Sequence, residues 1–272
     1  MRAGVQSMRG WPQALARLLL PCVCALCGAS GEGKVGKVDD LGGLGGLGNP
    51  GRWDGPGDGI VCAACRRAYL AASGPRCLRC ANPVGLADAL TPCAACQLEQ
   101  PAYDATVAAA DYGAPLDGLV LQLKFGGVLA LAPWCAGAIR TAVLARPGFL
   151  LPQLLCPVPM GPARLVDRGY NQALEIARPL SRALGIPLAA RLAIRALNTR
   201  AQSTVAPGER KKNIRDAFTV APDALAMVRG AHIGVVDDVM TSGHTLNELA
   251  RTFKRFGAAR VSNLVFARTP PP

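Results

Sequence analysis

The sequence predicts an α/β protein in which a parallel sheet flanked by helices follows a small cysteine-rich domain. Three observations support this fold class. Four C-x-x-C pairs gather eight of the 11 cysteines in the first hundred residues. From about residue 105, strand-like apolar runs alternate with helical periodicity, which is typical of a parallel sheet with helical crossovers. One apolar run, Ile233–Val236, leads through two acids and a hydroxyl-rich turn into a helix.

The paired cysteines predict two structural zinc sites with four thiolate ligands each. Two thiolates on a tight turn can bind one ion, and two such turns complete a closed tetrahedral site. The simplest pairing is sequential, but spacing alone leaves a crossed pairing open, and Cys22 competes with Cys24 for the first ligand position. The candidate ligands are Cys24, Cys27, Cys62 and Cys65 for one ion and Cys77, Cys80, Cys93 and Cys96 for the other.

A disulfide framework in a secreted protein is the alternative interpretation of these cysteines. It requires an export signal, but Arg17 and Pro21 interrupt the apolar run Leu15–Leu26, which we interpret as a short helix packed on the body. No apolar stretch reaches the roughly 18 residues of a transmembrane helix. The sequence therefore favours zinc over disulfides and a cytoplasmic location.

Two domains are expected. Residues 18–100 form a double zinc ribbon, interrupted by a glycine-rich, low-complexity insert at 31–59. Residues 105–270 form the α/β domain.

The first half of the α/β domain contains two strand-like and two helical segments. The run TVAAADY at 106–112 predicts a strand. Leu116–Phe125 and Val128–Leu144 have helical apolar spacing. Leu154–Val158 is short and apolar and is bounded by prolines, which predicts a short buried strand.

The second half continues the alternation. Asn171–Leu184 has apolar residues at helical spacing. Ile233–Val236 is apolar throughout, as expected for a strand covered on both faces. His244–Phe256 has one apolar face and is followed by Gly257, a helix stop. Arg260–Ala267 predicts the last strand.

The charge is concentrated in the α/β half. The chain has 30 Lys and Arg against 18 Asp and Glu, a formal net charge of +12. Residues 111–272 contribute 20 of these basic and 10 of these acidic residues. This excess favours an anionic partner for the α/β domain. Aromatic residues make up only 5% of the chain, which argues against a dense base-stacking surface.

The segment from Ile233 to Thr245 is the strongest functional signal. A helix that begins at the carboxyl edge of a parallel sheet offers free N–H groups and a favourable dipole to a phosphate. Thr241, Ser242 and Thr245 add hydroxyl donors, and Gly243 lets the backbone approach the phosphate. Asp237 and Asp238 are placed to accept hydrogen bonds from sugar hydroxyls. A plain strand–turn–helix with a Ser or Thr cap is the alternative.

This segment resembles the ribose-phosphate signature of type I phosphoribosyltransferases, and further motifs resemble the ComF family of competence-associated phosphoribosyltransferase-like proteins. The double zinc ribbon also resembles that family, whereas the insert at 31–59 departs from its pattern. The motifs are Leu123-Lys124-Phe125-Gly126-Gly127, Pro157-Val158-Pro159, Arg164, Arg168-Gly169-Tyr170-Asn171-Gln172-Ala173, Gln202 and Arg210-x-x-Asn213.

The resemblance implies that the chain binds phosphoribosyl pyrophosphate with Mg²⁺. Thr241, Ser242, Gly243, His244 and Thr245 would hold the 5′-phosphate, with His244 in a variable position and facing solvent. The acidic pair would hold the ribose hydroxyls. The implied pyrophosphate side comprises the Pro157–Pro159 turn, which includes Val158, with Arg164 and Arg168 behind it, and a lid at Thr199–Asn213 that carries Arg210. Asn171 is implied as a further substrate-binding residue. Lys124 is either a substrate contact or a helix-end cation.

Two function classes remain open at this point. The first is an enzyme in which Asp237, Asp238, Arg168 and Arg210 support displacement at ribose C1. The second is a binding module for incoming single-stranded DNA that retains the phosphoribosyl pocket, because proteins of the ComF family are associated with DNA uptake. Binding to DNA would then depend on backbone phosphates and weaken with salt. Competence proteins are implied as further partners.

Overall fold

The computed structural model describes residues 23–29, 60–70, 74–86, 91–195 and 217–271. Residues 15–22 of the expected N-terminal helix, the insert at 31–59 and the loop at 199–213 with Arg210 lie outside these ranges, as does Cys22, the alternative zinc ligand. The last four residues of that expected helix, 23–26, are described and form a bridge and a turn, so the prediction of a helix is wrong there. No helix within the described ranges is long and apolar enough to span a membrane.

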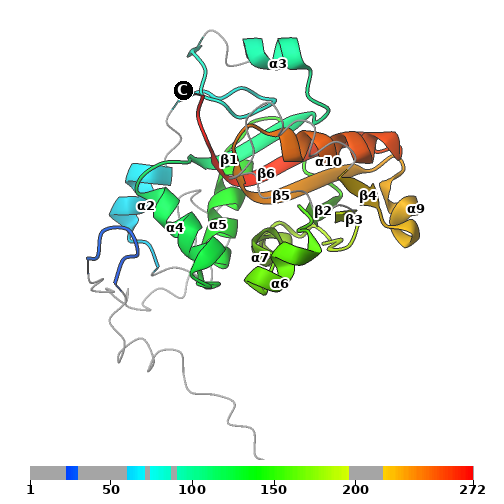
Figure 1. Ribbon diagram of the computed structural model, residues 1–272. Helices are drawn as coiled ribbons and strands as arrows, with labels where there is room; N and C mark the ends of the chain where they lie inside the picture. Colours follow the sequence, from blue (N-terminus) through cyan, green and yellow to red (C-terminus); the bar gives the residue numbers. More distant parts are fainter. Residues whose placement is uncertain (1–22, 30–59, 71–73, 87–90, 196–216, 272) are drawn as a thin grey trace, which may run out of the picture.

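Four parallel strands form the central sheet, in the order β1-β6-β5-β2 (Figure 1). They are β1 (Ala105–Asp111), β2 (Leu154–Pro157), β5 (His232–Met240) and β6 (Arg260–Arg268). The two central strands, β5 and β6, are buried over most of their length because helices or loops cover both faces of the sheet. The predicted α/β class is confirmed.

Three helices cover one face of the sheet: α4 (Leu116–Phe125), α5 (Leu131–Leu144) and α7 (Gln172–Leu184). Trp134 of α5 packs against Phe266 of β6 with ring centroids 5.3 Å apart. The first cysteine ribbon joins this core through Cys24 and Cys65.

The opposite face packs on α10 (His244–Arg255) and on a small antiparallel sheet (Figure 1). This small sheet consists of β3 (Ala193–Arg195) and β4 (Phe218–Val220). A 3-10 turn at Pro222–Ala224 and the short helix α9 (Leu225–Val228) follow it. The second cysteine ribbon shares this core, so the two ribbons lie on opposite faces of the sheet.

Each ribbon contains one short helix that begins at a C-x-x-C pair. In the first ribbon α2 spans Ala63–Leu70, and in the second α3 spans Ala94–Glu99. A further helix that the sequence analysis did not predict, α6 (Pro162–Arg168), has no buried residue and therefore lacks apolar periodicity. Two features of the sequence could have predicted α6: Pro162 in its first turn and Gly169 at its end, where φ is +79°.

The main difference from prediction lies in β5, which extends to Met240 rather than ending at Val236. Both acids are therefore strand residues, Asp237 opposite Val265 of β6, and their side chains do not simply project from a loop. The second helix also begins three residues later than expected, at Leu131.

Candidate phosphate site and cysteine clusters

The N-terminus of α10 lies at the carboxyl edge of the sheet, directly after β5. Gly243 is its N-cap residue and has φ of +78°, in the left-handed region. No side chain caps the helix, so neither Thr241 nor Ser242 forms the hydroxyl N-cap that is expected of a purely structural turn. Ser242 Oγ instead lies 2.9 Å from His244 Nδ1, and His244 is half-buried rather than fully solvent-facing as predicted.

The uncapped turn is open to solvent on one side. Thr241 and Ser242 are exposed, Gly243 is buried, and Thr245 is half-buried. The first N–H groups of a helix have no partner within the helix. Their dipole favours an anion. The turn can therefore bind a phosphate by its backbone, as the sequence indicates.

Gly243→Ala is expected to weaken phosphate binding at this turn. A Cβ there would lie 2.6 Å from Met240 Cε and 3.4 Å from Tyr103 Oη, and φ of +78° disfavours any side chain. The Met240 side chain can move away from the added methyl group, but the left-handed φ strains the turn itself. We therefore expect affinity for a phosphorylated ligand to fall at least about tenfold and the unfolding free energy to fall by about 1–3 kcal/mol. Calorimetric titration and chemical denaturation measure the two effects. Gly118→Ala, with no atom near the added Cβ, is the matched control.

The two acids of β5 have different surroundings. Asp238 is buried, with 3% of its surface exposed, and its Oδ2 forms an ion pair with Lys124 Nζ at 3.1 Å. Asp237 is half-buried, and its Oδ1 accepts the Asp238 N–H at 2.9 Å. Lys124 is thus a cation in the last turn of α4 that contacts an acid of the site, and its contact with a substrate stays a prediction.

Burial raises the pKa of Asp237 well above its usual value, and repulsion from Asp238 raises it further, while Lys124 opposes the rise. A cation or a hydroxyl donor beside this carboxyl group would stabilise its ionised form. A raised pKa of this kind is expected where a ligand, rather than another group of the protein, compensates the charge of the carboxylate.

The segment after β2 lies beside the acids. The Val158 N–H donates to the Val236 carbonyl at 2.9 Å, which continues the pairing of β2 with β5. The Asn171 amide nitrogen donates to the Val158 carbonyl at 3.0 Å, and Asn171 Oδ1 caps α7 by accepting from two N–H groups. The Asn171 side chain therefore holds the segment after β2 through the Val158 carbonyl and also caps α7.

Arg168 and Arg164 lie on α6, which packs against the end of α4. The Arg168 guanidinium stacks over the Phe125 ring at 5.0 Å from its centroid, and the Tyr170 hydroxyl donates to the Leu123 carbonyl at 2.5 Å. Both arginines are half-buried, so they are neither free surface charges nor fully enclosed.

Arg195 was not singled out by the sequence analysis. It ends β3, stacks on Phe218 at 5.4 Å, and has a pKa lowered by burial and by Arg164 but raised by Asp237. The charges of Asp237 and Arg164 therefore both act on Arg195. The only signal in the sequence was a basic residue at the end of a three-residue strand, too short for its periodicity to be recognised.

The eight paired cysteines form two groups, and the pairing is sequential. Within each group the sulfur atoms all lie within 4.8 Å of one another. The closest contacts, such as 3.6 Å between Cys80 and Cys93 and 3.9 Å between Cys27 and Cys62, are too long for disulfides. They approach the separation of about 3.8 Å that a tetrahedral Zn–S length of about 2.3 Å requires.

The cysteine groups also provide the hydrogen bonds expected around thiolates. The Cys62 N–H donates to Cys24 Sγ, and the Cys93 N–H donates to Cys77 Sγ, each at 3.3 Å. A hydrogen bond from Cys80 lowers the pKa of Cys77 to about 4, although burial opposes it. The donor set fits a metal ion that prefers four sulfur ligands, and zinc is such an ion.

Comparison with known proteins places the chain among phosphoribosyltransferase-like sequences. Residues 171–270 match the family described as the Phosphoribosyl transferase domain. DNA utilization protein YhgH of Escherichia coli K12 is 32% identical over 212 residues, which cover 77% of this chain and 90% of that protein. Competence protein F of Haemophilus influenzae is 29% identical, over 76% of this chain and 90% of that protein.

Among solved structures, the purine phosphoribosyltransferase from Pyrococcus horikoshii Ot3 is similar to this chain. The match has 18% sequence identity and a TM-score of 0.26, and it covers 58% of this chain and 74% of that one.

Proposed function

The chain belongs to the ComF family of phosphoribosyltransferase-like proteins, together with DNA utilization protein YhgH and competence protein F; from this premise we propose that it binds phosphoribosyl pyrophosphate with Mg²⁺ on the turn between β5 and α10. The observation that carries the proposal is the uncapped N-terminus of α10, with Gly243 as its N-cap residue, which follows a strand with two adjacent acids near its end. This combination serves a sugar phosphate better than either part alone.

The 5′-phosphate would be held by backbone N–H groups of Thr241–Thr245 and by the exposed hydroxyls of that segment. Asp237 is the more open of the two acids, so we assign it the ribose 2′- and 3′-hydroxyls. Asp238 would share that role when its ion pair with Lys124 breaks. Mg²⁺ prefers oxygen ligands and keeps several waters, so it would arrive bound to the pyrophosphate.

The pyrophosphate would lie against the Val158–Pro159 turn, with Arg164, Arg168 and Arg195 around it. A guanidinium fork can bond two phosphate oxygens at once. The loop from Thr199 to Asn213, which carries Arg210, is our candidate for the lid over the leaving group.

We propose displacement at ribose C1 as the reaction of this site. The C1–O bond to pyrophosphate breaks, pyrophosphate leaves with both electrons of that bond, and a nucleophilic acceptor forms the new bond at C1. Mg²⁺ and the arginines would stabilise the charge on the leaving group. The acidic pair would hold the sugar while positive charge develops at its ring.

Calorimetric titration of the full zinc-loaded chain with phosphoribosyl pyrophosphate tests the proposal. We expect Mg²⁺-dependent binding of one ligand per chain, with weaker binding of ribose 5-phosphate, which lacks the pyrophosphate. Absence of any Mg²⁺-dependent affinity would overturn the proposed ligand.

Single-stranded DNA is the second candidate ligand, and one surface favours it. Phe125 is 73% exposed, Arg168 stacks on it, and the apolar residues Leu165 and Val166 beside them are also exposed. Aromatic and basic groups on one surface can bind bases and backbone together. The name of YhgH, a DNA utilization protein, supports this candidate.

Fluorescence anisotropy with a labelled oligonucleotide tests this candidate. Affinity should fall steeply between about 50 and 200 mM salt, and Phe125→Ala should weaken binding. Leu144→Ala, at an exposed apolar residue of α5, is the control. Binding that does not depend on salt would exclude a backbone contact.

We assign structural zinc to both cysteine groups and place the protein in the cytoplasm. Four thiolates leave no open position for a substrate, and they must stay reduced to bind the ion. We also propose domain limits at 18–100 and 105–270.

A further inference from the structure

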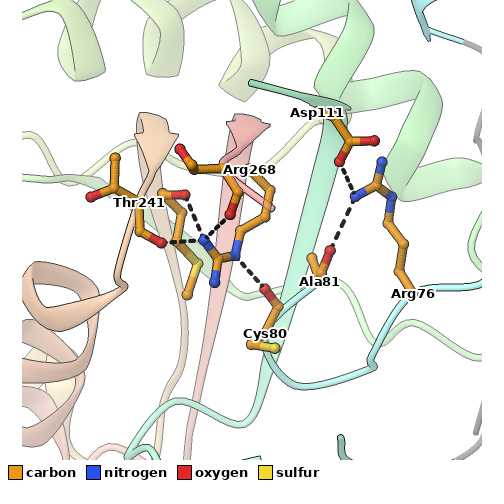
Figure 2. Close-up of polar contacts among 8 residues, drawn as sticks. Arg76, Cys80, Ala81, Asp111, Thr241 and Arg268 are labelled. Atoms are coloured by element: carbon orange, nitrogen blue, oxygen red, sulfur yellow. Dashed lines mark hydrogen bonds and ion pairs between the residues drawn. The ribbon is translucent and has the colours of Figure 1, made fainter. Parts of the chain in front are cut away.

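Arg268, at the end of β6, joins the second cysteine cluster to the phosphate turn. Its side chain is buried, with 6% of the residue exposed. Its Nε donates to the Cys80 carbonyl at 3.0 Å, and one terminal nitrogen donates to the carbonyls of Met240 at 3.0 Å and Thr269 at 2.6 Å. The same nitrogen also contacts the Thr241 carbonyl (Figure 2).

The two sides of this contact belong to the two candidate sites. Cys80 is one of the four sulfur donors of the second cluster. Met240 and Thr241 lead directly into Gly243, the N-cap of α10. A single planar group thus fixes a carbonyl of the metal cluster and the carbonyls at the start of the phosphate turn.

The neighbouring part of the cluster is held separately. Arg76 donates from one nitrogen to the Ala81 carbonyl at 3.1 Å and to Asp111 at 2.8 Å (Figure 2). Ala81 has φ of +59°, an uncommon value for a residue with a side chain. The carbonyls of Cys80 and Ala81, at the end of the first cysteine pair of the second cluster, are therefore each fixed by an arginine: Ala81 toward β1 and Cys80 toward the turn.

We propose that Arg268 is a positioning residue that couples the two sites, so that metal in the second cluster and a phosphate on the turn each strengthen the binding of the other. The proposal rests on the proposed function, because the phosphate is that of the sugar ligand. Coupling between two sites is reciprocal by thermodynamic linkage, so it can be measured from either side.

Charge balance supports this role. None of the ion pairs found between described residues includes Arg268, and its partners are carbonyl groups. A buried cation needs compensation. A zinc ion with four thiolates is a net anion, and the second cluster contributes a backbone carbonyl to this guanidinium. The loaded cluster would therefore stabilise the arginine in the position that orders the turn.

Hydrogen exchange of the zinc-loaded full chain tests the positioning role without any sugar ligand. In Arg268→Gln, amides of Thr241–Thr245 should exchange at least about tenfold faster than in the wild type. Arg146→Gln is the matched control, because Arg146 donates to Leu78 and Thr106 and so holds the same ribbon to β1 without reaching the turn. Unchanged exchange in Arg268→Gln, or equal acceleration in both variants, would overturn the positioning role.

Cadmium NMR tests the coupling. With ¹¹³Cd in both clusters, addition of phosphoribosyl pyrophosphate and Mg²⁺ should shift the resonance of the second cluster and leave that of the first unchanged. The shift should vanish in Arg268→Gln. Arg268→Lys keeps the charge, but a lysine ammonium cannot donate to both sites as the guanidinium does. Compared with Arg268→Gln, this variant should therefore recover more of the ligand affinity than of the shift in the second cadmium resonance.

The outcomes separate this inference from the proposed function. Binding of the ligand to the wild type without a shift of the second resonance would overturn the coupling and leave the ligand assignment intact. Failure of the wild type to bind the ligand would overturn the ligand assignment and with it the coupling, whereas the exchange measurement alone decides whether Arg268 positions the turn.

Discussion

Asp237→Asn is expected to make the protein more stable and to weaken binding of phosphoribosyl pyrophosphate strongly. Burial and the charge of Asp238 raise the pKa of Asp237, so the native state retains a proton that the unfolded chain releases. Ionisation of this group therefore opposes folding, and the unfolding free energy of the wild type should fall relative to the variant as pH rises from about 4. The neutral amide removes this cost.

The loss of binding has a separate cause. A carboxylate accepts hydrogen bonds from both ribose hydroxyls, whereas an amide offers one oxygen and loses the charge. Because hydrogen bonds to charged groups contribute about 1.5–3 kcal/mol each, we expect an affinity loss of about 100-fold. Urea denaturation across pH and calorimetric titration at pH 7 measure the two effects on one sample.

Asp238→Asn is the control and should change stability in the opposite direction. It leaves Lys124, whose side chain is 23% exposed, beside a neutral group. Breaking a fully buried ion pair costs about 3–5 kcal/mol, and partial exposure should keep the loss at or below the lower end of that range. If both variants destabilise the fold equally, the two acids are structural and the assignment of Asp237 to the ligand is wrong.

The sequence predicted the fold best where apolar periodicity was long. The helices at Leu116–Phe125 and after Asn171 have the predicted limits to within one residue, because each has a well-defined apolar face. The segments that sequence analysis did not find are short or exposed, such as α6, with no buried residue, and β3, with three residues. Neither is long enough to show a period.

The candidate site was predicted as residue types, and the structure adds their differences. Adjacent acids look equivalent in a sequence, but Asp238 pairs with Lys124, which comes from a helix more than a hundred residues earlier. The alternative of a Ser or Thr helix cap required coordinates for its exclusion. The role of Arg268 could not be predicted from the sequence, because a basic residue at the end of a strand does not reveal that carbonyls from three segments surround it.

Cys77→Ser is expected to unfold most of the protein, whereas Cys27→Ser should disrupt only the first ribbon. Cys77 is 1% exposed and lies in the core shared with α10, whereas Cys27 is exposed. The apparent binding free energy of structural zinc, about 10–16 kcal/mol, is comparable with the whole stability of a domain. Loss of the zinc ion destabilises the segments that the ion holds together, and the second cluster holds a segment that the sheet needs in order to fold.

The contacts of the second ribbon explain this asymmetry. Arg146 and Arg268 anchor its carbonyls to the sheet domain, and the Arg79 side chain donates to the Tyr103 carbonyl just before β1. Metal content by elemental analysis should fall from about two ions per chain to about one in Cys27→Ser, with the thermal unfolding of the α/β domain retained. Cys77→Ser should yield chain that has lost cooperative unfolding. If Cys27→Ser is the more damaging change, the first cluster supports the sheet, and the dependence of the α/β domain on the second ribbon is wrong.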